Sequence, residues 1–166
     1  MIPKSVIGVV FSPDEKQVLL TKRRDVPVWV LPGGGIERNE NPEDAIVREI
    51  LEETGFHVKI KRKVGNYYPV NRLAKKTCLY HCQIIKGNPT ISSETKEVKF
   101  FSFESLPKLI PPPYDLWIED TRTIGDFLLE KKLTSVNYRS LIKNLFRHPI
   151  LVIRFLLARL GLTINS

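Results

Sequence analysis

The stretch "LPGGGIERNENPEDAIVREILEETGF", Leu31 to Phe56, decides the fold of this chain. Three consecutive glycines are followed by Asn41 and Pro42, a helix cap and a first helical residue, and Gly55 has the residue type that commonly follows a helix end. These start and stop signals predict a helix over residues 42–54.

The predicted helix separates an apolar face from an acidic one. At about 100° per residue, Glu49, Glu52 and Glu53 fall within a sector of about 80°. The apolar residues Ile46, Val47, Ile50 and Leu51 point away from that sector. Three like charges so close repel one another, so the pattern predicts a positive charge among them.

A divalent cation fits this acidic face. Carboxylate oxygens are ligands that hard cations prefer, and Mg²⁺ commonly combines a few carboxylates with waters and substrate phosphates. Arg48 lies four residues before Glu52 and can hold that carboxylate by a salt bridge along the helix. The glycines have a separate role, because a backbone without side chains can approach a phosphate or a metal closely and can adopt positive φ angles.

The order of these residues resembles a complete Nudix box. From Gly34 the sequence runs G-x5-E-x7-R-E-I-L-E-E-x-G-F, ending at Phe56. A chance match of this length has a frequency on the order of 10⁻⁹ per start position. The resemblance extends through the surrounding strands and "EVKFFSFESLPKL", and covers roughly residues 3–133.

The resemblance implies an α/β fold, a Nudix-type α/β/α sandwich around a mixed sheet, and hydrolysis of a diphosphate with Mg²⁺ or Mn²⁺ as cofactor. It assigns metal-ligand positions to Glu49, Glu52 and Glu53, with the carbonyl of Gly33 or Gly34 as a further ligand. Glu40 and Arg48 match positions that support the helix and loop. The general base stays open between Glu52 and Glu53, and Glu94 or Glu97 could also contribute.

The substrate is expected to be a small nucleotide, that is, a nucleoside triphosphate, a dinucleoside polyphosphate or a nucleotide sugar. Arg23 and Arg24 are candidates for phosphate contacts. The aromatic residues that could stack on a base are Trp29, Tyr67 and Tyr68. The alternative from another functional class is a noncatalytic Nudix module that binds nucleotide or RNA, although all the box glutamates are present.

Composition bounds the other possibilities. The chain has 166 residues and a formal net charge of +8, which fits one globular domain with an anionic partner. "KIKRK", residues 59–63, reads as a strand with one solvated face, so nucleic acid is not an expected partner. No signal-peptide pattern opens the sequence, which predicts a cytoplasmic protein.

The remaining pattern is mostly strands, with one more helix. Strands are predicted near residues 5–24, 58–64, 77–85 and 97–102, and a second helix from the prolines at 111–113 through Phe127 and Leu128. The domain is expected to end near residue 135, with residues 136–166 forming a C-terminal helical extension.

That extension is basic and apolar. Over 138–147, a polar face (Arg139, Ser140, Lys143, Asn144 and Arg147) opposes Leu141, Ile142, Leu145 and Phe146. His148-Pro149 should interrupt the helix, and 150–160 is apolar nearly all round apart from Arg154 and Arg159. Residues 138–162 are therefore expected to pack on the domain, to form a homodimer, or to attach peripherally to an anionic membrane surface.

Overall fold

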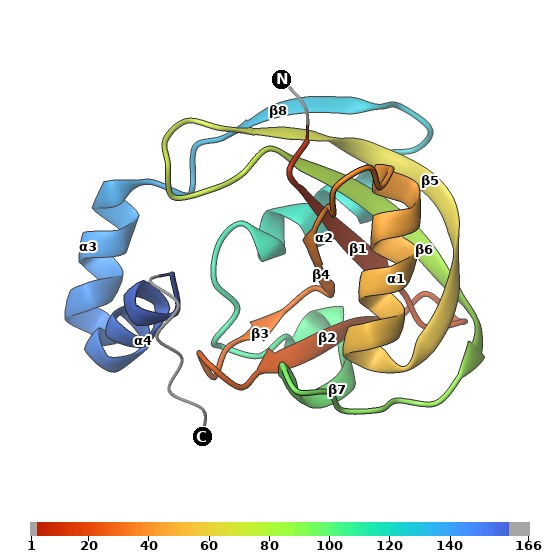
Figure 1. The fold of residues 1–166 in the computed structure, drawn as a ribbon, viewed down its shortest axis with the longest axis horizontal. Helices are drawn as coiled ribbons and strands as arrows, with labels where there is room; N and C mark the ends of the chain where they lie inside the picture. Colours follow the sequence, from red (N-terminus) through yellow and green to blue (C-terminus); the bar gives the residue numbers. More distant parts are fainter. Residues whose placement is uncertain (1–2, 160–166) are drawn as a thin grey trace.

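A computed structural model describes residues 3–159 (Figure 1). A five-stranded mixed sheet has the order β4-β1-β6-β5-β8, and a three-stranded antiparallel sheet has the order β3-β2-β7. The strands are β1 (Ser5–Val10), β2 (Gln17–Arg23), β3 (Trp29–Val30), β4 (Gly33–Gly35), β5 (Phe56–Pro69), β6 (Thr77–Gly87), β7 (Thr95–Ser102) and β8 (Leu129–Leu133). Helices α1 (Pro42–Thr54) and α2 (Tyr114–Thr123) contribute to separate cores, which confirms the α/β/α arrangement.

The two cores explain why β1 is apolar without alternation. Ile7 and Val9 pack in the core that contains Trp117 of α2. Val6 and Val10 pack in the core that contains Ile50 of α1. Successive side chains of a strand point to opposite faces, so a strand covered on both faces needs a continuous apolar run.

Helix α1 begins and ends at the residues that the sequence predicts. The Asn41 side chain accepts a hydrogen bond from the Asp44 N–H at 2.8 Å, and Pro42 occupies the first turn. Gly55 has φ of 77°, a left-handed conformation, and its N–H donates to the Leu51 carbonyl. These local caps set the two ends of the helix. Burial of Ile46 and Ile50 sets its orientation on the sheet, with Glu49 and Glu53 toward β4.

The second predicted helix is too long, and the prediction for Phe127 and Leu128 is wrong. Helix α2 ends at Thr123, and β8 begins at Leu129 and pairs in parallel with β5. The Arg62 guanidinium donates to the carbonyls of Thr121 and Ile124, so a cation from β5 satisfies the helix end. Phe127 is 80% exposed and belongs to the connection between α2 and β8.

The short elements agree with the predicted sequence of strands. The 3₁₀ turn η1 (Phe103–Ser105) follows β7, as the resemblance implied. "KIKRK" lies within β5, where Lys61 pairs with Glu15 at 3.0 Å.

Two helices follow the sheet, α3 (Tyr138–Arg147) and α4 (Pro149–Arg159), and the predicted break at His148-Pro149 is confirmed. Figure 1 shows the pair standing beside the domain. The Arg154 guanidinium joins it to the β2–β3 connection by donating to the Asp25 carbonyl at 2.8 Å. No helix within 3–159 is long and apolar enough to cross a membrane. The side chains of Asn144, Arg147 and Arg159, and residues 160–162 of the predicted segment, lie outside the described residues.

Candidate active site

Arg48 occupies the centre of the acidic face. Its Nε donates to Glu40 Oε1 at 2.8 Å and its Nη2 to Glu40 Oε2 at 3.0 Å, a bidentate ion pair. The same guanidinium reaches the Gly35 carbonyl at 3.1 Å. The Glu37 N–H also donates to Glu40, and together with Arg48 it lowers the pKa of Glu40 to about 2. Arg48 and Glu40 therefore connect helix α1, strand β4 and the loop between them.

Glu53 is held beside the glycine triplet. Its Oε2 accepts a hydrogen bond from the Gly33 N–H at 3.0 Å. The triplet is itself the edge strand β4, paired with β1, so this N–H has a fixed position. Burial raises the pKa of Glu53 to about 8, and the nearby charge of Glu49 acts in the same direction. A cation next to Glu53 would stabilise the ionised form of this buried carboxyl.

Glu49 packs against the next glycine. A Cβ on Gly34 would lie 2.5 Å from both carboxylate oxygens of Glu49, so glycine at this position leaves the space that the carboxylate fills. Burial raises the pKa of Glu49, although the Arg48 guanidinium, 3.1 Å away, opposes the shift. The glycines thus position two carboxylates, as well as bringing backbone close to a ligand.

The three box carboxylates do not form a closed ligand cage. Within residues 3–159, no group of three His, Cys, Asp or Glu side chains is arranged to hold a metal ion. Arg48 lies between two of them, with Nη1 at 3.1 Å from Glu49 and 3.2 Å from Glu52. The donor set suits Mg²⁺ or Mn²⁺, and Glu52 is 58% exposed on its side chain, so it can turn toward a cation.

Arg23 and Tyr114 are two residues outside the box whose pKa values respond to the charge of Glu53. The ion pair with Asp25 has the largest effect on the pKa of Arg23, burial has the largest effect on that of Tyr114, and the charge of Glu53 adds a smaller one to both. Arg23 is also paired with Asp25, whose Oδ1 lies 2.8 Å from Nε. Tyr114 was not predicted as a candidate, because a tyrosine after three prolines carries no signal of a site in the sequence.

Glu94 and Glu97, the two candidate carboxylates near β7, have different surroundings. Burial is the main cause of the raised pKa of Glu49 and of Glu53, and the charge of Glu94 adds to both shifts. Glu97 instead pairs with Lys22 at 2.6 Å across β2 and β7. Glu97 is therefore held by the sheet, and of the two only Glu94 remains a candidate for the site.

Comparison with known proteins identifies the family. The NUDIX domain matches residues 1–121. The chain belongs to the Nudix family. It is 36% identical over 113 residues to a putative 8-oxo-dGTP diphosphatase of Bacillus subtilis, covering 68% of this chain and 75% of that protein. It is 34% identical over 113 residues to an ADP-ribose pyrophosphatase of Methanocaldococcus jannaschii, covering 64% and 66%.

Solved structures agree with this assignment. An ADP-ribose pyrophosphatase from Streptococcus suis superposes with a TM-score of 0.63 at 26% identity. The match covers 79% of this chain and 99% of that one.

The remaining candidates for substrate contact lie at different depths in the Nudix hydrolase. Trp29 is partly buried and packs edge-on against Phe101, with Lys22 over its ring. Arg24 turns toward the β7 side, where its Nε donates to the Ser92 carbonyl at 3.1 Å. Neither contact covers the whole side chain, so substrate binding by Trp29 and by Arg24 stays a prediction.

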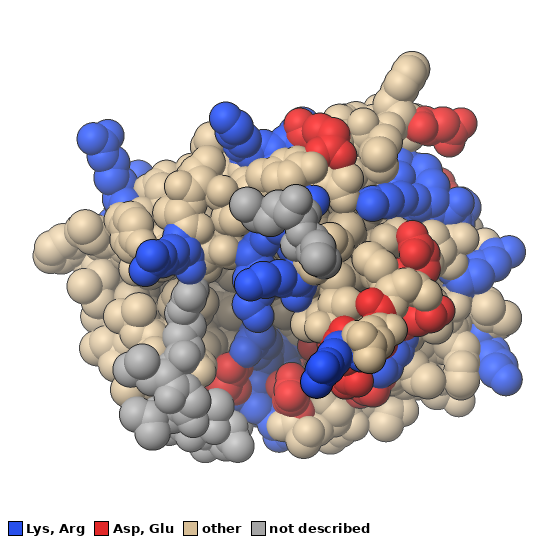
Figure 2. Space-filling view, turned by 45° about the horizontal axis from the view of Figure 1, so that its top comes forward, with Lys and Arg blue, Asp and Glu red and all other residues tan. Residues whose placement is uncertain are grey.

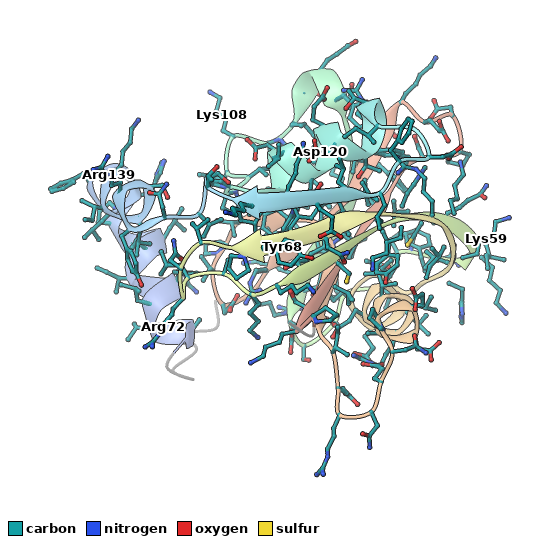
Figure 3. The ribbon with its side chains drawn as sticks, turned by 90° about the horizontal axis from the view of Figure 1, so that it is seen from above. Lys59, Tyr68, Arg72, Lys108, Asp120 and Arg139 are labelled. Atoms are coloured by element: carbon teal, nitrogen blue, oxygen red, sulfur yellow. The ribbon has the colours of Figure 1, made fainter. Side chains whose placement is uncertain are left out.

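The stacking prediction for Tyr67 does not fit the structure. Its ring is fully buried in the core on the α2 side, edge-on to Trp117, and its hydroxyl donates to Asp120 at 2.7 Å. Asp120 projects from α2 (Figure 3) and also accepts from Lys131. Tyr68 follows on the opposite face of β5, half-buried, with Lys76 4.9 Å from its ring centroid. Only Tyr68 of the two remains accessible to a ligand.

We expect Tyr67→Phe to lower the free energy of unfolding by about 1–3 kcal/mol, because it leaves a buried carboxylate with one hydrogen bond fewer. The Michaelis constant for substrate should not change. Denaturant unfolding and steady-state kinetics measure the two effects. Tyr68→Phe is the matched control and should change stability by less than about 0.5 kcal/mol. A raised Michaelis constant with unchanged stability for Tyr67→Phe would restore the stacking role.

Proposed function

We propose that this Nudix pyrophosphohydrolase cleaves a nucleoside diphosphate linked to another moiety, in a reaction that requires a divalent cation. The observation that carries the proposal is the packing of Glu49 and Glu53 against the glycine edge strand. Burial raises the pKa of both carboxyls, so their ionised forms lack sufficient neutralising charge in the protein alone. A bound cation would supply it.

The cation would be held by Glu49, Glu52 and Glu53, with a carbonyl of Gly33 or Gly34. When bound, it neutralises charge on the diphosphate oxygens and makes a water more acidic. Arg48 contacts a single oxygen of Glu49 and a single oxygen of Glu52, so the other oxygen of each can face a cation. Its bidentate pair with Glu40 holds the guanidinium in place. The Gly33 N–H orients Glu53 through a single hydrogen bond and leaves the other carboxylate oxygen open to a ligand or a proton.

Glu94 is the strongest candidate for a further carboxylate in the reaction, as a proton acceptor alongside Glu52 and Glu53. Its charge acts on both buried glutamates, and its side chain is exposed. The backbone carbonyl of Glu94 accepts from the Arg24 N–H at 3.0 Å, which ties its loop to the end of β2. A carboxylate on an accessible loop can meet substrate without first leaving a buried position.

One face of the molecule carries a band of basic side chains. Figure 2 shows Lys and Arg side chains running down the middle of one face, with acidic side chains at the lower end of this band. Such a field attracts a polyanion such as a diphosphate. The charges of Arg23 and Glu53 each affect the pKa of the other, which supports Arg23 as a candidate for phosphate contact. Trp29 and Tyr68 are the candidates to contact the rest of the substrate.

The deciding experiment is product analysis for a panel of nucleotides, with Mg²⁺, with Mn²⁺ and with excess chelator. The panel includes 8-oxo-dGTP, ADP-ribose and an RNA with a 5′-triphosphate, because related proteins are named for 8-oxo-dGTP, ADP-ribose and RNA. We expect at least one nucleotide to be cleaved at its diphosphate with either metal, and chelator to reduce the rate to background. Unchanged activity in chelator would exclude the metal requirement. No cleavage of any nucleotide would favour a binding module.

A further inference from the structure

The helix pair α3–α4 exposes an unusual amount of apolar surface. Phe146 is 84% exposed and Ile150 is 70% exposed. Eight large apolar side chains between 138 and 159 are exposed: Tyr138, Ile142, Leu145, Phe146, Ile150, Ile153, Phe155 and Leu156. Isolated exposed apolar residues are ordinary on protein surfaces, but a group of this size on two consecutive helices indicates an interaction site.

These side chains are ordered by the helix period. On α3, Tyr138, Ile142 and Leu145 recur at spacings of four and three residues, and so lie on one face. On α4, Ile150, Ile153 and Leu156 recur every three residues. The apolar face of α3 is therefore turned to solvent, although an amphipathic helix that belonged to a core would turn it inward.

Helix α4 is attached to the domain on another side. Val152 is buried, and the Arg154 guanidinium donates to the carbonyls of Asp25 and Arg24. Asn71 of the β5–β6 loop donates to the Val136 carbonyl just before α3. These contacts hold the helix pair against the domain and leave its apolar surface outward, so binding at that surface does not require the pair to detach.

The charged side chains after Glu130 are all of one sign, positive. Seven of the 26 Lys and Arg residues follow Glu130, and none of the 18 Asp and Glu residues does. Arg139 and Lys143 are exposed on α3 and border its apolar face. Figure 3 shows Arg139 on the helix pair and Arg72, from the β5–β6 loop, on the same side of the molecule, with Lys59 at the opposite end.

We propose that the α3–α4 pair binds the surface of a membrane that contains anionic lipids. Apolar side chains bordered by Lys and Arg, without any acidic residue, match the boundary between headgroups and acyl chains, where the side chains enter and the cations meet phosphates. A second copy of this chain is a poorer partner, because two such surfaces would bring Arg139 and Lys143 of each copy against like charges.

The test is co-sedimentation of the full chain with vesicles of phosphatidylcholine alone or of phosphatidylcholine mixed with phosphatidylserine. We expect binding to the mixed vesicles that weakens as salt is added. The double variant Phe146→Ser, Ile150→Ser should lower the ratio of bound to free protein at least about tenfold, because it removes two of the most exposed apolar side chains. Phe127→Ser is its matched control, since Phe127 is 80% exposed but lies between α2 and β8.

The charge contribution is tested by a second pair of variants. Arg139→Gln with Lys143→Gln should reduce binding to mixed vesicles several-fold, whereas Lys59→Gln with Lys86→Gln removes the same charge from exposed positions on β5 and β6 and should not. Thermal unfolding checks that every variant is folded. Failure of the full chain to bind mixed vesicles, or wild-type binding by folded Phe146→Ser, Ile150→Ser, would overturn the proposal. A dimer in sedimentation velocity that this double variant dissociates, with no vesicle binding, would assign the surface to a second copy.

Discussion

Glu53→Gln is expected to lower kcat by about 10²–10⁴-fold, the range seen when a positioned acid–base group or an equivalent electrostatic contact is lost. Glutamine keeps the shape of the side chain and an oxygen to accept the Gly33 N–H, which lies 3.0 Å from Glu53 Oε2. What it removes is the ability of this carboxyl to ionise, and so to give a negative charge to a bound cation or accept a proton. The change therefore tests the charge of Glu53, with little change in packing.

The free energy of unfolding of Glu53→Gln distinguishes a loss of catalysis from damage to the fold. Burial raises the pKa of Glu53 to about 8, so the ionised side chain is disfavoured where it stands. The neutral glutamine should leave the free energy of unfolding unchanged or higher, which is the usual relation between stability and activity at a functional site. The measurements are steady-state kinetics at saturating Mg²⁺ and denaturant unfolding.

Glu119→Gln is the matched control for the charge change. Glu119 is exposed on α2 and its ion pair with Arg122, at 3.5 Å, is of the surface kind that contributes little. Its kcat should be close to that of the unaltered protein. If Glu53→Gln kept near-normal kcat, the buried carboxylate would have no part in the reaction. Glu52 and Glu94 would then be the remaining candidates for proton acceptor.

Local signals in the sequence were sufficient for α1 and for the box. Asn41, Pro42 and Gly55 act within one or two turns of the helix, so their effect does not depend on the rest of the fold. The same holds for the break at Pro149, where the ring removes a hydrogen bond whatever surrounds it. For this reason the positions of Glu49, Glu52 and Glu53 on one face could be predicted directly.

Elements defined by distant contacts could not be predicted in this way. Residues 124–128 have an apolar pattern that suits a helix, but Arg62 from β5 satisfies the end of α2 and the chain then pairs with β5 as β8. Tyr67 and Tyr68 are neighbours in sequence, and only the pairing of β5 and the placement of α2 decide that one is buried and the other accessible.

The glycine triplet gives the second large prediction, because its members differ in what surrounds them. Gly34→Ala is expected to lower kcat/KM by about 10–100-fold, the effect typical of disturbing residues that orient a ligand carboxylate. The new Cβ would meet the carboxylate oxygens of Glu49 at 2.5 Å. These atoms are the end of a flexible side chain, so the carboxylate moves while the fold persists, and the unfolding free energy should change by no more than about 1 kcal/mol.

The two neighbouring glycines provide the controls. Gly35→Ala should have near-normal kcat/KM, because a Cβ there meets nothing within 4 Å. Gly33→Ala should instead destabilise the fold, since φ is 146° and the Cβ would lie 2.3 Å from the Val6 carbonyl oxygen, in backbone that pairs with β4. Kinetics with Mg²⁺ titration and denaturant unfolding of all three variants distinguish the outcomes. Wild-type kcat/KM for a folded Gly34→Ala would show that the position of Glu49 against β4 does not matter for the reaction, and the metal-ligand role of Glu49 would have to be given up.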